Sequence, residues 1–261
     1  MVLSSASPLV FDPIAAQALP LEWLPPDWQF VVRNWDYLAG GLGVTIVLTA
    51  TSILLGFLAG FPMGAIEVYG SGPLKRLVST VGVVLRAIPI VVILVFMFFV
   101  APIPFPSGEF GMWLPGIGSF DIGLSAFAAA TVGLGLRSAA YQAQIFRGAL
   151  QSVSGGQMEA ARSVGMSKLQ AIRHVIMPQA LRRSIPGFQN EFTIVLKDTS
   201  VAFAIGLAEL LKRSYDLFVE STTAVLEVIL FISILYFIMT FVTNRTLDYL
   251  GEYYAIPGGE G

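Results

Sequence analysis

Long apolar stretches separated by short polar connections make up most of this chain. A helix needs about 20 apolar residues to cross the hydrocarbon core of a bilayer, because each residue adds about 1.5 Å along the axis. Five stretches meet that length, at about residues 38–68, 77–100, 121–148, 188–211 and 223–249. The pattern therefore predicts an all-α integral membrane protein with about five transmembrane helices.

Two prolines refine this prediction. Pro89 lies inside the second stretch, where it removes a backbone hydrogen bond and predicts a kink. Pro186 stands just before the fourth stretch, where proline is tolerated at a helix start. Residues 101–120 form a proline- and glycine-rich connection. We divide the chain into an extracytoplasmic or interfacial N-terminal segment (1–36), a transmembrane domain (37–250) and a cytoplasmic tail (251–261).

The N-terminal segment has two interpretations. It contains several prolines and acidic residues and lacks the basic-then-apolar pattern of a secretory signal peptide. Trp23, Trp28 and Phe30 are typical of aromatic anchors at a membrane interface. The segment is therefore either such an anchor or a loosely ordered tail.

A polar segment, residues 154–178, separates the third and fourth apolar stretches. Ser154 with Gln157, and Ser167 with Gln170, are spaced as capping boxes that begin helices. Gly165 lies between them and can adopt the left-handed conformation that ends a helix. The segment therefore predicts two short helices joined at an elbow, the second ending near Pro178.

The distribution of basic residues orients the predicted spans. Cytoplasmic connections are enriched in Lys and Arg. The connections between spans three and four and between spans one and two carry several basic residues: Arg162, Lys168, Arg173, Arg182, Arg183, Lys75 and Arg76. We therefore expect an external N-terminus and a cytoplasmic C-terminus. Lys212 and Arg213 argue the other way, although Asp216 and Glu220 lie close enough in sequence to offset them.

Composition excludes several classes of site. The chain has no cysteine and one histidine, so a thiolate or histidine-built metal site is not expected. The formal net charge of -2 gives no reason to expect a nucleic-acid partner. No Gly-x-x-x-x-Gly-Lys-Ser/Thr phosphate loop occurs, so we expect no ATP hydrolysis by the chain itself.

The polar segment carries a family resemblance. Glu159-Ala160-Ala161, then Gly165, then the run 175–178 (VIMP) resemble the EAA loop of ATP-binding-cassette (ABC) importer permeases. The blocks AYQAQIFRGAL, MPQALRRSIPGFQNEF and LKDTS resemble the polar amino acid branch of that family, which includes histidine, glutamate, glutamine, arginine and opine importers. The resemblance extends from about Gly43 to Tyr249. Val175 and Met177 depart mildly from its usual Ile-x-Leu-Pro ending.

The resemblance implies a fold, partners and a location. It implies a type I ABC importer permease in the plasma (inner) membrane of a prokaryote, completed by a second permease chain, identical or homologous. A cytoplasmic ATPase dimer would bind ATP and Mg²⁺, and an extracytoplasmic solute-binding protein would deliver substrate. The residues expected to dock on the ATPase are Gly156, Gln157, Glu159, Ala160, Ala161 and Gly165. The alternative for this segment is an amphipathic elbow that rests on the lipid surface.

Charged residues inside the predicted spans indicate the substrate site, because a charge at the bilayer centre is costly. Arg137, Tyr141 and Gln144 fall on one face of the third span, and the fourth carries the run 197–200 (Lys197, Asp198, Thr199 and Ser200). By helical rise, Arg137 and Lys197 each lie roughly 15 Å from the elbow end of their spans, near the midplane.

We expect these two faces to form a polar cavity for an amino acid. Arg137 or Lys197 would meet the substrate carboxylate and Asp198 its ammonium group. The alternative is that Lys197 and Asp198 pair with each other or cap neighbouring helices. Gln144 stands where many members of the resembled family have Glu, which favours a neutral or acidic substrate over a cationic one.

Two other classes of membrane protein are compatible with the apolar pattern. An ion-coupled secondary transporter or channel subunit predicts internal repeats and broken spans, and no repeat is evident in the sequence. A scaffold without transport activity would leave the midplane charges as an unexplained cost.

Overall fold

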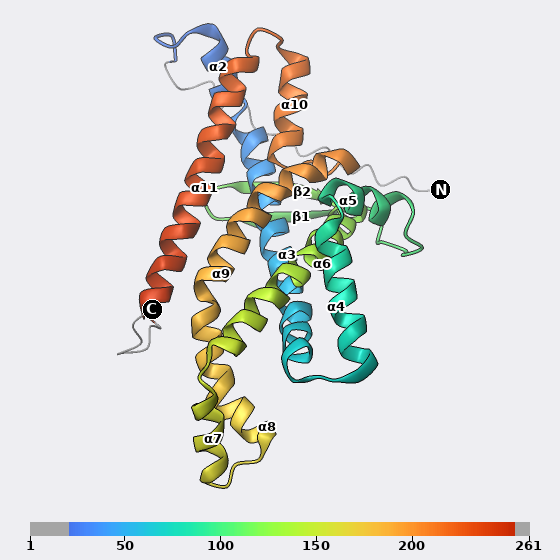
Figure 1. The fold of residues 1–261 in the computed structure, drawn as a ribbon. Coiled ribbons are helices and arrows are strands. Elements are labelled where there is room, and N and C mark those ends of the chain that lie inside the picture. The colour runs from blue at the N-terminus through green and yellow to red at the C-terminus, as the bar shows by residue number, and fades with distance from the viewer. Residues whose placement is uncertain (1–20, 254–261) are drawn as a thin grey trace.

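The computed structural model describes residues 21–253, so the predictions for residues 1–20 and 254–261 lie outside the described part. The elements in chain order are α2 (Pro26–Arg33), α3 (Trp35–Tyr69), α4 (Gly72–Ala87), α5 (Ile90–Phe99), β1 (Glu109–Leu114), β2 (Gly118–Gly123), α6 (Leu124–Ser152), α7 (Gly155–Ser163), α8 (Lys168–Ala171), η1 (Ile172–Ile176), α9 (Met177–Asp198), η2 (Thr199–Ile205), α10 (Leu210–Glu220) and α11 (Val225–Tyr253). Figure 1 shows α7 and α8 at one end of the molecule, called the elbow end below, and α2 and α10 at the other.

Two of the predicted spans are confirmed by length and composition. Helix α3 and residues 225–249 of α11 are long and apolar enough to cross a membrane, and the bent pair α4 and α5 would provide a third span. Helices α6 and α9 correspond to the third and fourth predicted spans. Within residues 21–253 they do not meet the same criterion, because they carry more polar and charged residues.

Helices α3 and α6 form the central contact of the fold. Gly56, Gly60 and Gly64 recur every four residues on the face of α3 that packs on α6. A Cβ atom at Gly60 would lie 2.6 Å from the carbonyl oxygen of Ala139, and one at Gly64 would lie 2.8 Å from that of Ala143. The two backbones are therefore in direct contact, as small residues permit between membrane helices.

The bend predicted at Pro89 is present, and it is large enough to divide the second predicted span into two helices. Helix α4 ends at Ala87, and α5 begins at Ile90 at an angle of 104° to it. Ile88, the residue before Pro89, is extended, with φ -83° and ψ 132°. A residue that precedes proline is disfavoured in the helical region, because the proline ring clashes with its backbone. This clash keeps Ile88 out of the helix, so α4 ends at Ala87, two residues before Pro89.

The connection 101–120 contains structure that the all-helical prediction missed. Strands β1 and β2 pair antiparallel, from Glu109 opposite Gly123 to Leu114 opposite Gly118. Gly116 and Gly118 at the turn have φ of 79° and 93°, which glycine adopts without strain. Alternating β2 side chains, Phe120 and Ile122, are buried. The hairpin is therefore a small amphipathic sheet that packs on α3.

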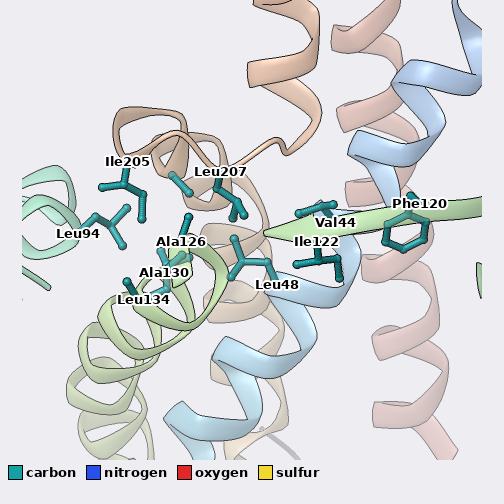
Figure 2. Packing of buried hydrophobic residues seen from close by; sticks show 12 residues of the cluster. Val44, Leu48, Leu94, Phe120, Ile122, Ala126, Ala130, Leu134, Ile205 and Leu207 are labelled. Carbon is teal, nitrogen blue, oxygen red and sulfur yellow. The ribbon is translucent and has the colours of Figure 1, made fainter. Parts of the chain in front are cut away.

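An apolar cluster joins this hairpin to four other elements. Figure 2 shows Val44 and Leu48 of α3 and Phe120 and Ile122 of β2 packed near alanines of α6. Leu94 of α5, Ile205 of η2 and Leu207 in the turn that follows η2 complete the cluster. Its members come from segments far apart in the sequence, and their packing fixes the elements that surround the middle of α6.

The elbow and the fourth span also differ from the prediction. The second elbow helix does not end near Pro178. It continues from α8 through the π-helical turn η1 into α9, which contains Pro178 in its first turn and Pro186 inside it. In η1, the Met177 amide bonds to the Ile172 carbonyl five residues back, and this wider turn leads into the proline. The expectation of a helix start at Pro186 was therefore wrong.

The fourth predicted span, 188–211, is not one helix. Helix α9 ends at Asp198, η2 follows as a 3₁₀ helix, and Gly206, with φ 77°, turns the chain before α10 begins at Leu210. The basic residues after this turn have protein partners: Lys212 pairs with Asp216, and the buried Arg213 donates a 2.9 Å hydrogen bond to the Tyr37 carbonyl. The predicted offset of Lys212 by Asp216 is confirmed.

We expect Gly60→Ala to separate α3 from α6, because its methyl group would meet a backbone carbonyl that cannot move independently of its helix. Overpacking of this kind costs about 1–3 kcal/mol. Thermal unfolding of the purified chain in detergent should show a lower midpoint. Gly148→Ala in α6 is the matched control, since nothing lies within 4 Å of its Cβ position, and it should leave the midpoint unchanged or higher. Equal behaviour of the two variants would contradict the backbone contact.

Candidate functional site

Helix α6 positions the central group of polar side chains. Helix α6 packs against α3, α4, α5, α9 and η2, so each of these elements contacts part of its surface. Arg137 and Tyr141 lie one turn apart on α6, and the Arg137 guanidinium carbon is 5.2 Å from the centroid of the Tyr141 ring. This cation–π arrangement orients the guanidinium group along the surface of α6.

Arg137 and Asp198 form an ion pair between α6 and the last residue of α9. Their side chains are 21% and 24% exposed, respectively. The pair therefore retains access from outside the protein. The Arg137 Nε atom is buried and has no hydrogen-bond partner in residues 21–253. Asp198 pairs with Arg137 on the neighbouring helix instead of with the adjacent Lys197, which is exposed.

The other two residues of the KDTS run bond to their own helix. The Thr199 hydroxyl donates to the Leu196 carbonyl at 2.7 Å, and the Ser200 hydroxyl donates to the Lys197 carbonyl at 2.7 Å. Thr199 is fully buried and Ser200 is half-buried. These bonds form where α9 tightens into the 3₁₀ helix η2, so both hydroxyls satisfy carbonyls at the helix end.

Gln144 bonds to a residue that the sequence analysis did not select. Its Nε2 atom donates to the Glu67 Oε2 atom of α3 at 2.9 Å. Arg147 Nη1 lies 3.5 Å from the same oxygen. The structure thus brings Arg137, Tyr141 and Asp198 together, whereas Gln144 belongs to a second group nearer the elbow end. The signal for Glu67 was an acidic residue inside an apolar stretch.

A chain of buried polar groups links the same helices behind the ion pair. Ser138 donates to the Glu191 carboxylate at 2.7 Å, and the Gln142 amide donates to Ser138 at 3.0 Å and to the Ile53 carbonyl of α3 at 3.2 Å. Glu191 is 3% exposed. None of these buried polar residues was predicted from the sequence. Glu191 precedes Asp198 by seven residues, which places both acids on one face of α9.

The elbow has the predicted turn and one of the two predicted capping boxes. Gly165 has φ 87°, and the reciprocal Ser167 and Gln170 box is present. Ser154 caps α7 by accepting from the Gly156 amide at 3.3 Å, and the box predicted with Gln157 does not form. The Gln157 side chain instead accepts from Gln179 of α9 at 3.4 Å.

The predicted docking residues differ in solvent exposure. Gly156, Gln157, Glu159, Ala160 and Gly165 are exposed. Ala161 is buried inside the elbow, where the Met166 amide donates to its carbonyl. Two apolar side chains that the sequence analysis did not select, Val164 and Leu169, are 74% and 75% exposed. The elbow therefore presents a mixed polar and apolar surface, of the composition found at protein interfaces.

The chain matches the family described as "Binding-protein-dependent transport system inner membrane component" over residues 52–252. It is 32% identical over 222 residues to the probable amino-acid permease protein YxeN of Bacillus subtilis (strain 168), covering 85% of this chain and 93% of the relative. It is 31% identical over 221 residues to the glutamine transport system permease protein GlnP of Escherichia coli (strain K12), covering 85% and 94%.

Solved structures agree with these sequence relationships. A chain of the crystal structure of an amino acid ABC transporter with histidines superposes with a TM-score of 0.71 at 29% identity, covering 85% of this chain and 96% of that one. A chain of the inward-facing MetNI methionine ABC transporter superposes with a TM-score of 0.64 at 21% identity, covering 83% and 95%, and shows the fold alone.

We expect loss of either partner of the Arg137–Asp198 pair to destabilise the fold. Arg137→Asp alone should lower the free energy of unfolding by roughly 1–3 kcal/mol, less than for a fully buried pair because solvent reaches both side chains. The double variant Arg137→Asp, Asp198→Arg should recover most of that loss. Thermal unfolding in detergent measures both. A double variant no more stable than the single variant would contradict a direct pairing of α6 with α9.

Proposed function

The chain belongs to the family of binding-protein-dependent transport system inner membrane components, and on that premise we propose that it forms the amino acid path of an ATP-driven importer. It is a permease subunit of an ABC importer in a prokaryotic inner membrane. The observation that carries the amino acid assignment is the Arg137–Asp198 pair, one cation and one anion that remain partly exposed inside the helix bundle.

We propose that a zwitterionic amino acid binds by inserting between these two groups. Its carboxylate would replace Asp198 at the Arg137 guanidinium, and its ammonium group would replace Arg137 at the Asp198 carboxylate. Charge pairs of this kind are strong because both partners are ionised. Tyr141 would hold Arg137 in place, and the exposed Lys197 could meet the carboxylate as substrate enters. The names of the relatives, which include amino acid and glutamine permeases, support this substrate class.

We propose that the elbow is the contact with the ATPase subunits. Its exposed residues and the adjacent Val164 and Leu169 would form that surface. Two bonds support transmission of force into the bundle: Gln179 to Gln157, and Arg183 to the Ser152 carbonyl at the end of α6. ATP and Mg²⁺ would be held by the ATPase subunits, because the chain has no phosphate loop.

A second permease chain would complete the translocation path. The outward faces of α4, α5 and α11 carry many exposed large apolar side chains, among them Val92, Phe96 and Phe237. Lipid and a second chain both match such a surface. One chain has few spans with which to enclose a translocation path, and this supports a pair of permease chains. The family resemblance implies the same arrangement. A solute-binding protein would deliver substrate at the end opposite the elbow.

Broken helices do not favour an ion-coupled transporter here. Broken spans are expected of that class, and breaks occur at Ile88 and at Gly206. The family match shows instead that this chain is an importer permease component, so the breaks are a property of its fold.

We expect Glu159→Lys to uncouple the permease from its ATPase. The variant reverses a charge on the exposed side of α7, so it should reduce co-purification with the ATPase and stimulation of ATP hydrolysis by the binding protein. Glu252→Lys, an exposed acid at the end of α11, is the matched control and should retain both. If the two variants behave alike, the elbow is not the ATPase contact.

Transport by the complete complex in lipid vesicles tests the substrate class. Of the twenty proteinogenic amino acids supplied singly, we expect a few to be accumulated in an ATP-dependent manner. Arg137→Gln should lower their transport about tenfold or more, because it removes a hydrogen bond to a charged group. Accumulation of none of the twenty, or unchanged transport by the variant, would overturn the proposed site.

A further inference from the structure

Glu67 is a buried carboxylate with only one of its two oxygens paired. It lies in the last turn of α3 and is 4% exposed. Oε2 accepts the 2.9 Å bond from Gln144 and lies 3.5 Å from Arg147 Nη1, both on α6. Oε1 is buried and has no hydrogen-bond partner in the described part of the chain. A buried oxygen left unpaired is costly, so this arrangement calls for an explanation.

A second arginine borders the unpaired oxygen. Arg86 of α4 donates from Nη1 to the Ala140 carbonyl of α6 at 2.8 Å. A Cβ atom placed on Gly82 of α4 would lie 3.2 Å from Arg86 Nη1 and 3.8 Å from Glu67 Oε1. Both charged groups therefore border the space beside Gly82, and this glycine puts no side chain into it. A movement of α4 against α3 that closes this space would bring the two into contact.

The same end of α3 is packed against the elbow. Ala65, Val68 and Tyr69 contact an apolar cluster that includes Val153, just before α7, and Ile176 of η1. Arg147 lies in the last turns of α6, which lead directly into the elbow. A displacement of the elbow therefore acts on α6 and α3 at the level of Glu67, where α4 also meets them.

We propose that Glu67 is a positioning residue that couples the elbow to α3 and α4 by exchanging partners. Its carboxylate holds α6 through Gln144 and Arg147 in this conformation, and it pairs with Arg86 once the elbow has moved. Two discrete arrangements of one buried charge give the bistable element that a rigid-body transition requires. The inference rests on the proposed function of the elbow and extends it to a residue that does not touch the ATPase.

The test uses the complete complex in vesicles, with ATPase and binding protein, and an equimolar mixture of the twenty radiolabelled amino acids as probe. The readout is the amino acid accumulated per ATP hydrolysed. Glu67→Gln keeps the shape of the side chain and removes its charge, so this ratio should fall about tenfold, the factor that loss of one charged hydrogen bond predicts. Glu252→Gln, an exposed acid on α11, should leave the ratio unchanged.

A double variant separates coupling from stability. Glu67→Gln with Gln144→Glu moves the carboxylate from α3 to α6 across the same hydrogen bond, and the number of charges is conserved. We expect it to restore the thermal midpoint and yield of the complex but not the ratio of transport to hydrolysis. Restoration of both would mean that Glu67 is only structural, and the proposal would be overturned.

Gly82→Ala tests the exchange with Arg86. Its methyl group would occupy the space that Arg86 and Glu67 border, without altering the bond from Glu67 to Gln144. The ratio should fall as in Glu67→Gln, and an unchanged ratio would rule out pairing with Arg86. If the wild-type complex transports nothing from the mixture, the proposed function fails. If the wild type transports and Glu67→Gln keeps its ratio, this inference alone fails.

Discussion

The contact between the backbones of α3 and α6 is the interaction on which the rest of the structure depends. In a lipid environment, helices gain little from burying apolar side chains, so close packing and interhelical hydrogen bonds must hold them. The glycine face of α3 allows that approach, and it brings polar groups of α6 within reach of α3. Gln142 then reaches the Ile53 carbonyl, and Gln144 reaches Glu67. With this pair fixed, α6 can present its remaining faces to α4, α5 and α9.

An ion pair between two helices sets the electrostatics of the candidate site. Asp198 is the last residue of α9, inside the helix bundle, where an unpaired carboxylate would be costly. Arg137 of α6 compensates this carboxylate. The 3₁₀ helix η2 follows directly and carries the chain into the apolar cluster around α6. The polar candidate site and the apolar cluster that supports it therefore lie next to each other in the bundle.

Much of the fold could be predicted from the sequence, because the apolar stretches, the elbow turn at Gly165 and the resemblance carried by the EAA loop depend on local patterns. The errors have two causes. Pro178 was expected to end a helix, but the π-helical turn before it keeps the chain helical. The hairpin 109–123 and the end of α9 at Asp198 depend on packing against α3, α5 and α6, which no local pattern records. Of the candidate site, the sequence indicated Arg137 and Asp198 but not their pairing.

The sequence by itself determined a membrane-embedded helical permease with a polar elbow, because hydropathy, basic residues and motif spacing are properties of consecutive residues. Tertiary structure alone decided which charges meet. Asp198 pairs across helices with Arg137 rather than with its neighbour Lys197, and Gln144 faces the carboxylate of Glu67, 77 residues away in the chain. These pairings follow from how closely α3, α6 and α9 approach one another, and that distance is set by side chains contributed from the whole bundle.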